Sequence, residues 1–265
     1  MVRRPAKLLR DLTHALATSV VTQTDRVTVE TGNLRELITR ARFVLFDFDG
    51  PICRLFAGHA AEDIADSFVE WLEIRGLSGV LTDEERKYKD PQALLRVVDL
   101  RHPGSDLVTE MEERLTTEEI KAASTAMPTP FADMLIRTWT AVGCRLAITA
   151  NNSARMIHEY LANRGLLSCF APHIYGRTRN LGQLKPDPHC LNRALRAMGA
   201  APSEALMIGD SSADVEAARQ AGVPFLGYAR NEDKSNFLRN AGAENVVDSL
   251  SPLLEIVKAA GHTSE

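Results

Sequence analysis

The sequence has 265 residues, of which 45% are hydrophobic and 25% charged, and its formal net charge is −4. This balance excludes a strongly basic nucleic-acid-binding protein, and no apolar stretch reaches the length of a transmembrane helix. We therefore expect one or two domains with a substantial buried core and neither nucleic acid nor membrane as a partner. The four cysteines have no CxxC spacing, which indicates a reduced, cytoplasmic protein without a disulfide framework or a zinc site.

Residues 1–32 carry no regular apolar pattern and are expected to form a mobile polar extension. Their basic start is similar to that of an export signal, but Asp11, Thr13 and His14 interrupt it before a long enough apolar region develops. A basic docking segment for a partner is the alternative interpretation. Residues 33–40 have helical spacing and are expected to lead into the first strand of the core.

A short apolar run at residues 43–48 ends at Gly50 and Pro51, a pattern typical of a buried strand in a parallel sheet. Side chains two residues apart on a strand point the same way, so Asp47 and Asp49 are expected to converge. Two carboxylates that lie so close require a cation or a shared proton. The alternative is that Asp47 merely ends the strand and Asp49 begins an ordinary turn.

Residues 53–129 are predicted to form a helical cap inserted after the first strand, because apolar residues recur there at helical spacing and no convincing strand pattern is present. The predicted helices are marked by residues 64–72, 91–100, 107–111 and 118–126. Pro128 and Pro130 stiffen the chain where it returns. We expect residues 127–130 and 53–58 to form the two hinges between the cap and the core.

From residue 130 onward strands alternate with helices, which predicts a parallel sheet with right-handed crossovers. The predicted strands cover residues 144–150, 173–176, 205–209, 224–228 and 244–247, and the predicted helices cover residues 131–142, 153–164, 188–198 and 213–221. We expect an α/β core made of residues 33–52 and 130–256, followed by a C-terminal tail at 257–265.

Thr149, Asp210 and Asp214 lie at or just after the ends of two further predicted strands. Ligands of open α/β sheets collect beyond the carboxyl ends of the strands, so we expect these side chains to gather with the two carboxylates of the first strand. Each also has a simpler explanation. Asp210 could simply cap the helix that follows, and Asp214 could be a solvated residue of that helix. The hydroxyl of Thr149 could be buried and bonded to the backbone. Lys185, which precedes a proline, fits an ordinary solvated turn.

The order of these residues resembles the four motifs of the haloacid dehalogenase superfamily: DxDG at 47–50, a threonine at 149, KPD at 185–187 and GDSSAD at 209–214. The likeness is to the phosphatase branch with an inserted helical cap, which includes phosphoglycolate phosphatases and beta-phosphoglucomutases. It implies a Rossmann-like parallel sheet with an all-helical cap. Pro51 departs from the pattern, because phosphatases of this family more often have threonine there.

The resemblance implies a role for each motif residue. Asp47 would be the nucleophile that forms an aspartyl-phosphate, and Asp49 would act as the general acid and then as the general base. Lys185 and Thr149 would complete the catalytic set by binding the phosphoryl oxygens. Backbone N–H groups at the following helix start would add further donors. The implied substrate-binding residues are Gly50, Thr149, Ala150, Asn151 and Lys185.

The same resemblance implies a Mg²⁺ site, because carboxylate and carbonyl oxygens suit this ion. Asp47 and Asp210 would bind it directly. Asp49 would contribute its backbone carbonyl, and Asp214 would bind directly or through water. Zinc does not fit, since no histidine or cysteine clusters with these acids in the sequence.

An acid two residues after the nucleophile distinguishes phosphatases of the superfamily from its dehalogenases, since an alkoxide needs a proton in order to leave. We therefore expect Mg²⁺-dependent hydrolysis of a small phosphomonoester. The alternatives are a phosphomutase, which keeps water away from the aspartyl-phosphate, and a non-catalytic ligand-binding protein of the same fold. Substrate selection would fall to the cap, where the candidate residues are Arg54, His59, Arg96, Arg101 and His102.

Overall fold

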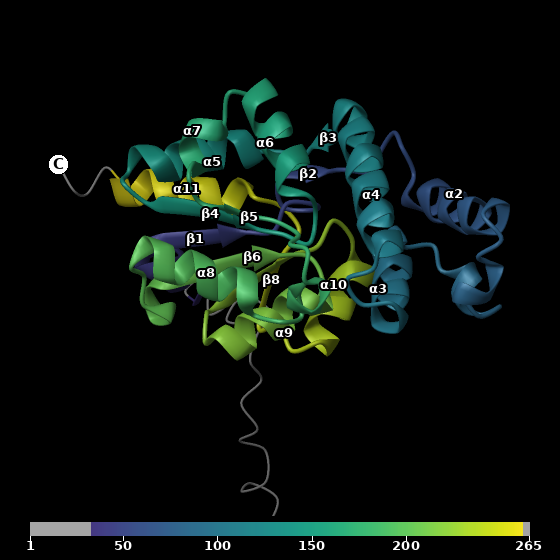
Figure 1. Ribbon diagram of the computed structural model, residues 1–265. Coiled ribbons are helices and arrows are strands. Elements are labelled where there is room, and N and C mark those ends of the chain that lie inside the picture. Colours follow the sequence, from purple (N-terminus) through teal and green to yellow (C-terminus); the bar gives the residue numbers. More distant parts are fainter. Residues whose placement is uncertain (1–32, 262–265) are drawn as a thin grey trace, which may run out of the picture.

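Six parallel strands of the described chain form the central sheet, in the order β5–β4–β1–β6–β7–β8 (Figure 1). The structure is a computed structural model that describes residues 33–261. The predicted N-terminal extension at 1–32 and the last four residues, 262–265, lie outside the described residues. The strands are β1 (Phe43–Phe46), β4 (Arg145–Thr149), β5 (Ile174–Tyr175), β6 (Ala205–Gly209), β7 (Phe225–Tyr228) and β8 (Asn245–Val247). The predicted parallel α/β sheet is confirmed.

Helices cover both faces of this sheet (Figure 1). One face carries α5 (Ala132–Ala141), α6 (Ala154–Asn163), α7 (Leu167–Phe170) and α11 (Ser251–Gly261), and the other carries α8 (His189–Met198), α9 (Ser212–Ala221) and α10 (Glu232–Asn240). Because side chains alternate along β1, Val44 and Phe46 pack under the first group and Leu45 packs under the second. Phe46 meets Trp139 and Phe170 edge to face, with ring centroids 5.8 and 6.1 Å apart. Short 3-10 helices η3 (Leu181–Gln183) and η4 (Pro202–Glu204) lie in the connections.

In the described chain the cap lies beyond the carboxyl ends of the strands (Figure 1). It contains α2 (Ala61–Ile74), α3 (Pro91–Arg101) and α4 (Asp106–Thr125), with 3-10 helices η1 (Ser78–Val80) and η2 (Glu85–Lys87) between α2 and α3. Two of these helices begin at side-chain caps. Asp90 accepts a hydrogen bond from the N–H of Gln92 at 2.8 Å, and Ser105 accepts one from the N–H of Val108 at 3.3 Å.

Helix α4 is one continuous helix of 20 residues, where the sequence pattern predicts two separate helices at 107–111 and 118–126. That prediction is wrong because polar residues conceal the buried face of the helix. Thr116 and Glu119 are buried, and both accept hydrogen bonds from the guanidinium of Arg177 in the core. A helix that buries polar side chains against a partner shows no apolar periodicity at those positions.

Two short strands lie where the cap joins the core: β2 (Cys53–Arg54) pairs antiparallel with β3 (Met127–Pro128). The sequence pattern predicts no strand here, since strands of two residues are too short to show alternation. Both fall within the predicted hinge segments. The residue after β3, Thr129, ties the returning chain to the turn after β1, because its Oγ1 donates to the carbonyl oxygen of Gly50 at 2.5 Å.

The apolar interior crosses the boundary between cap and core in both directions. Ala122 of α4 packs in the apolar cluster of the core. Leu181 and Leu184, which precede Lys185 in the core, pack instead in the apolar cluster of the cap. The cap and the loop before Lys185 therefore share one packed interior.

The last helix reaches further than the sequence pattern predicts. Helix α11 continues to Gly261, and Val257 is buried in the core. The predicted tail therefore does not begin at residue 257, because the apolar face of this helix extends beyond the predicted boundary. A helical segment at residues 33–40 precedes β1, as predicted.

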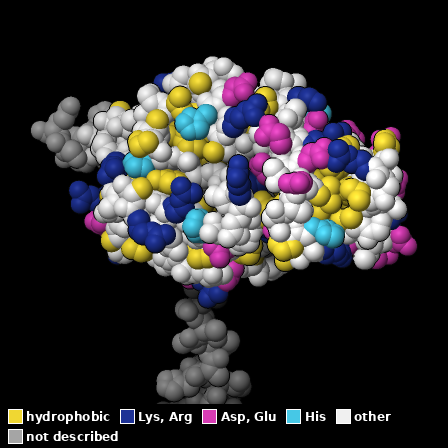
Figure 2. All heavy atoms as spheres, in the orientation of Figure 1, with side chains coloured by type: hydrophobic (Ala, Val, Ile, Leu, Met, Phe, Trp, Pro, Cys, Tyr) yellow, Lys and Arg dark blue, Asp and Glu magenta, His cyan; other side chains and the backbone are white. Residues whose placement is uncertain are grey.

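Acidic and basic side chains lie side by side over the cap on the face shown in Figure 2. This mixture agrees with the small net charge of −4. Among the described residues, no helix combines the length and the apolar character that crossing a bilayer requires.

Candidate active site

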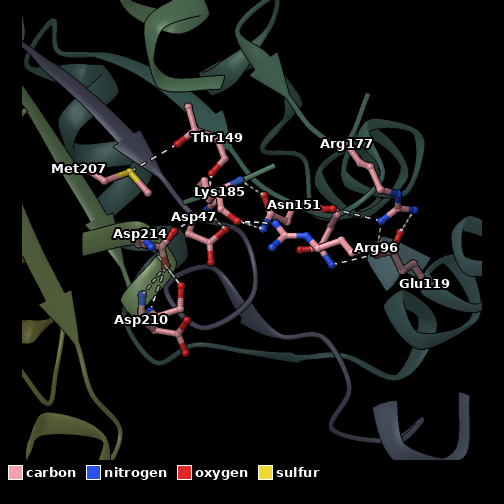
Figure 3. Close-up of polar contacts among 12 residues, drawn as sticks. Asp47, Arg96, Glu119, Thr149, Asn151, Arg177, Lys185, Met207, Asp210 and Asp214 are labelled. Carbon is pink, nitrogen blue, oxygen red and sulfur yellow. Dashed lines mark hydrogen bonds and ion pairs between the residues drawn. The ribbon is translucent and has the colours of Figure 1, made fainter. Parts of the chain in front are cut away.

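The candidate site lies where the carboxyl ends of β1, β4 and β6 meet (Figure 3). In the register of the sheet, Phe46 lies between Ile148 of β4 and Ile208 of β6. The residues that follow these strands therefore emerge side by side. Asp47 follows β1 and Asp210 follows β6, so the sheet brings together two carboxylates that are far apart in the sequence.

Lys185 is the central cation of the site, and its side chain is 2% exposed. Its Nζ donates hydrogen bonds to Asp47 Oδ1 at 2.7 Å, to the carbonyl oxygen of Thr149 at 2.8 Å and to Asp214 Oδ1 at 2.5 Å. Burial alone would lower the pKa of Lys185, but Asp214 and Asp47 outweigh it and hold this pKa above its ordinary range. The ammonium group therefore stays charged beside Asp47.

The side chain of Asn151 fixes the backbone at Lys185. Its Oδ1 accepts a hydrogen bond from the N–H of Lys185 at 2.8 Å, and its Nδ2 donates to the carbonyl oxygen of Lys185 at 3.1 Å. Arg96 of cap helix α3 donates to the same carbonyl oxygen (Figure 3). The loop after β4 and the loop that carries Lys185 are thus joined to each other and to the cap.

Asp214 is fully buried at the start of α9, and both of its oxygens are engaged. Oδ1 accepts from Lys185, while Oδ2 accepts from the N–H groups of Asp210 and Ser211 at 3.2 and 3.0 Å and from the Ser211 hydroxyl at 2.7 Å. Gly209 is required here, since a Cβ at that position would lie 2.6 Å from the Asp214 carboxyl carbon. Asp214 therefore orients Lys185 and the turn that carries Asp210.

Three carboxylates form the only cluster among the described residues that could hold a metal ion: Asp47, Asp210 and Asp214 each offer an oxygen within 4.8 Å of the other two. Burial, followed by the charge of Asp214, raises the pKa of Asp47 to about 8. Burial likewise raises the pKa of Asp210. Carboxylate oxygens are the donors that hard divalent cations prefer, so these residues fit Mg²⁺.

Asp49 lies at the mouth of the same site but is held differently. Its Oδ1 accepts a hydrogen bond from the N–H of Leu55 at 2.8 Å, across the turn that leads into the cap. Burial is the main cause that raises its pKa to about 6. The carboxyl of Asp49 can therefore gain and lose a proton near neutral pH. Its predicted role as a metal ligand through the backbone carbonyl stays a prediction.

Gly50 shapes the turn after β1. Its φ is +106°, and a Cβ there would lie 2.6 Å from the carboxyl carbon of Asp210, so no other residue fits. The N–H of Gly50 donates to the carbonyl oxygen of Cys53 at 2.7 Å, and its own carbonyl oxygen accepts from Thr129. Both polar groups are used within the protein. The resemblance implies that Gly50 binds substrate, whereas in the structure both of its polar backbone groups form hydrogen bonds within the protein at the turn.

Two predicted phosphoryl donors do not face the site. The hydroxyl of Thr149 is fully buried and donates to Sδ of Met207 at 3.4 Å (Figure 3). The N–H of Ala150 donates to the carbonyl oxygen of Tyr175 at 3.0 Å as part of the sheet. The reason for the first difference is alternation along β4, which places Thr149 on the same face as Met207 of β6. In the structure, Thr149 contributes its carbonyl oxygen to Lys185.

The next two N–H groups are available instead. In the described chain the backbone N–H groups of Asn151 and Asn152 make no hydrogen bond. Both residues line the same cavity as Asp47 and Lys185. Of the two backbone donors that the resemblance implies, Asn151 has an N–H group unpaired among the described residues and Ala150 does not, and Asn152 adds a second unpaired N–H group.

The cavity above these groups has a volume of about 300 Å³ and is closed on one side by the cap. The cap residues that line it are Phe56, Ala61, Lys89, Asp90 and Gln92. Lys89 is a half-exposed cation whose Nζ also contacts Asp66 of α2 at 2.7 Å. No sequence signal distinguishes Lys89 from other surface lysines, because only the tertiary fold brings the start of α3 over the site.

None of the cap residues predicted to select substrate lines this cavity. His59 pairs with Glu118 at 2.8 Å, and Arg101 pairs with Glu85 at 2.7 Å. Arg54 and His102 are exposed. Arg96 comes nearest, through its contact with the Lys185 carbonyl oxygen.

Lys234 adds a second cation that the sequence analysis missed. It lies on α10, and its Nζ contacts Asp210 Oδ2 at 3.0 Å. Its helix follows β7, so Lys234 reaches the same carboxyl edge of the sheet. Lys234 therefore borders the site through its contact with Asp210.

A sequence profile of the haloacid dehalogenase-like hydrolases matches residues 41–222. The chain is 32% identical over 118 residues to the phosphoglycolate phosphatase of Nitrosococcus oceani, covering 44% of this chain and 52% of that protein. It is 28% identical over 184 residues to the phosphoglycolate phosphatase of Aquifex aeolicus, covering 69% and 82% of the two chains. The chain spans about half the length of the first of these relatives.

Solved structures show the same fold. A predicted phosphoglycolate phosphatase from Haemophilus somnus superposes with a TM-score of 0.60 at 16% identity, covering 82% of this chain and 98% of that one. CbbY from Rhodobacter sphaeroides, in complex with phosphate, superposes with a TM-score of 0.59 at 21% identity and covers 82% and 99%. With its sequence profile and its fold in agreement, this chain belongs to the haloacid dehalogenase-like hydrolase family. The family recognised from the four motifs is thereby confirmed.

Proposed function

We propose that this protein is a Mg²⁺-dependent phosphatase that hydrolyses a small phosphomonoester through an aspartyl-phosphate on Asp47. The observation that carries the proposal is the position of Asp47: its carboxylate contacts Lys185 and also faces the cavity. Asp49, two residues further on, has a pKa near 6 and borders the same cavity. A nucleophile and a proton donor therefore share one small space.

In the proposed reaction Asp47 attacks the phosphorus atom, and Asp49 protonates the departing oxygen. Asp49 then removes a proton from the water that hydrolyses the aspartyl-phosphate. Lys185 neutralises charge on the phosphoryl oxygens while Asp214 keeps its ammonium group in place. The free N–H groups of Asn151 and Asn152 are the proposed backbone donors to the same oxygens.

The proposed metal ion would be held by Asp47 and Asp210, with Asp214 and the backbone carbonyl of Asp49 as further candidate ligands. When bound, it offsets the negative charge of the carboxylates and of the phosphoryl group. The need for such an ion follows from the charges. Among the described residues, the four carboxyls of the site form ion pairs with only two cations, Lys185 and Lys234.

For the substrate, a small acid phosphate such as phosphoglycolate is the first candidate, since curated relatives bear that name. Lys89 and Gln92 on the cap wall would contact the part of the substrate that lies beyond the phosphoryl group.

The four cysteines are unpaired among the described residues, which supports the proposed cytoplasmic location.

A panel of phosphomonoesters, including phosphoglycolate and p-nitrophenyl phosphate, tests this proposal with and without Mg²⁺. We expect release of inorganic phosphate that requires the metal and falls by more than about 1,000-fold in Asp47→Asn. Formation of an isomeric phosphate without free phosphate would favour the phosphomutase instead. Absence of turnover across the panel would favour a non-catalytic binding protein.

A further inference from the structure

A buried ion pair joins cap helix α4 to the core. The side chains of Arg177 and Glu119 are both 0% exposed, and two parallel hydrogen bonds of 2.9 Å link them (Figure 3). Arg177 also donates to Glu112 and Thr116 at 3.0 Å, so one guanidinium binds three polar side chains along a single face of α4. Glu113, on the neighbouring face of the helix, pairs instead with Arg155 at the surface.

The same pair holds the loop that follows β4. Glu119 accepts hydrogen bonds from the side-chain amide of Asn152 and from the N–H of Ser153, both at 3.0 Å. The N–H of Arg177 donates to the carbonyl oxygen of Asn152 at 2.8 Å, and its Nη1 donates to that of Asn151 at 3.1 Å. Arg177 thus binds the carbonyl oxygens of two consecutive residues of this loop, Asn151 and Asn152.

These contacts set the direction of one peptide group. In a trans peptide the N–H points away from the carbonyl oxygen of the same unit. Because the carbonyl oxygen of Asn151 is turned to Arg177, the N–H of Asn152 is turned the other way. That N–H has no partner in the described chain, and Asn152 borders the cavity that contains Asp47.

Gly176 allows the two segments to approach. A Cβ at this position would lie 2.5 Å from the carbonyl oxygen of Asn152 and 2.6 Å from the backbone nitrogen of Ala154. Only glycine therefore lets the chain before Arg177 pack directly against the loop. The missing side chain and the ion pair therefore act on adjacent peptide groups of one loop: Gly176 approaches the carbonyl oxygen of Asn152, and Arg177 Nη1 binds the carbonyl oxygen of Asn151.

We propose that Arg177 and Glu119 are positioning residues, which hold the Asn151–Asn152 peptide so that the N–H of Asn152 binds a phosphoryl oxygen. The inference rests on the proposed phosphatase function. A buried ion pair adds little stability compared with apolar residues of the same size, so a role in geometry accounts better for its presence. Since Glu119 belongs to the cap, a seated cap becomes a condition for phosphate binding.

The second loop of the site depends on the cap in the same manner. Arg96 of α3 donates to the carbonyl oxygen of Lys185, and Leu181 and Leu184 pack in the apolar cluster of the cap. Asn151 links this loop to the first one through its two hydrogen bonds with the Lys185 backbone. The cap therefore contacts both loops that bind the phosphoryl group.

The test is the double variant Arg177→Met/Glu119→Leu, measured by calorimetric binding of inorganic phosphate and by steady-state kinetics, each with Mg²⁺. Replacing both partners avoids an unpaired buried charge, so the variant is expected to fold. We expect the dissociation constant of phosphate to rise by about 10- to 100-fold, the loss expected for one hydrogen bond to a charged group. The Mg²⁺ activation constant should change less than twofold.

The matched control is Arg155→Met/Glu113→Leu, which removes an exposed ion pair between the same cap helix, α4, and core helix α6. It should leave both constants within twofold of the wild type. If the double variant at 177 and 119 unfolds, Arg177→Lys takes its place, because a lysine keeps the charge beside Glu119 but lacks the donors that reach Asn151. The same rise in the phosphate dissociation constant is expected.

A variant that is folded and binds phosphate as the wild type does would overturn the inference. The inference would also be overturned if phosphate affinity, Mg²⁺ activation and the melting temperature all fell together. That result would show a merely structural role for the ion pair. The proposed function fails separately, if the wild type binds phosphate but hydrolyses no phosphomonoester. Absence of phosphate binding by the wild type would reject the anion site itself.

Discussion

Asp49 has two tasks in the proposed reaction, and its surroundings suit both. Burial raises its pKa to about 6, so neither protonation state is rare near neutral pH. The hydrogen bond from the N–H of Leu55 fixes one carboxyl oxygen, and the other has no hydrogen-bond partner among the residues that the structure describes. A carboxyl held in this way can give a proton in one step and take one in the next.

Replacing Asp49 by asparagine removes the proton donor and keeps the shape of the side chain. We expect kcat to fall by about 100- to 10,000-fold for an alkyl phosphate, whose leaving group needs a proton. For p-nitrophenyl phosphate the loss should be smaller, because nitrophenolate leaves without one. Steady-state kinetics with both substrates measure the difference. Equal losses would show that Asp49 does not act as the general acid.

Gly209 gives a second test at the scale of single residues. In Gly209→Ala the new Cβ would lie 2.6 Å from the Asp214 side chain, which orients Lys185. We expect a loss of stability of about 1–3 kcal/mol and at least tenfold lower kcat. Gly79→Ala is the control, since no atom lies within 4 Å of a Cβ there. Urea unfolding and kinetics compare the two, and equal effects would contradict this assignment.

At the scale of elements, the site is assembled from helices and loops that lie far apart in the sequence. Helix α10 contributes Lys234, whose contact with Asp210 would compete with the proposed metal ion for that carboxylate. Helix α3 contributes Arg96, and helix α4 contributes Glu119. The sheet brings the acidic side chains together, whereas the helices supply residues that contact these acids and the loops around them.

The variant Lys234→Met tests the contribution of α10. Without the ammonium group, Asp210 is free to bind the cation, so we expect the Mg²⁺ activation constant to fall by about 2- to 5-fold. Titration of activity with Mg²⁺ gives this constant. Lys121→Met, which removes a surface pair with Glu118, is the control and should leave the Mg²⁺ activation constant unchanged. A higher constant in Lys234→Met would mean that Lys234 helps to hold the metal site.

Much of this arrangement could be predicted from the sequence, because buried strands leave apolar runs and the acids follow them directly. For Thr149 the sequence leaves two possibilities open, a phosphoryl donor and a buried hydroxyl, since the face on which a terminal strand residue lies depends on tertiary packing. The buried contacts of Arg177 could not be predicted from the sequence. Its partners Glu112 and Glu119 lie 65 and 58 residues away, and a buried arginine has the same local pattern as a solvated one.

At the scale of the whole molecule, the buried carboxyls of the site make the stability of the fold depend on pH. The pKa values of Asp47 and Asp49 rise from 3.8 to about 8 and about 6 in the folded protein. The folded state therefore binds more protons than the unfolded state between these limits, and the free energy of unfolding falls as the pH rises. This contribution is complete below about pH 3.8 and is lost as the pH passes through about 6 and then about 8.

The metal ion should reverse this loss, because it binds the ionised carboxylates. We expect Mg²⁺ to raise the free energy of unfolding more at pH 8 than at pH 5, as measured by urea unfolding with Mg²⁺ and with a chelator. In Asp47→Asn the difference between the two pH values should shrink. Greater stabilisation at pH 5 would contradict the assignment of the metal to these carboxylates.

The proposed mechanism requires Asp47 to carry the phosphoryl group during turnover. The most direct measurement is to quench the enzyme during turnover of a phosphomonoester with Mg²⁺, reduce it with borohydride, and identify the modified residue by peptide mass spectrometry. An aspartyl-phosphate is reduced to homoserine, so we expect homoserine at position 47 and nowhere else. An unmodified Asp47 under conditions in which phosphate is released, or modification of another residue, would contradict the account.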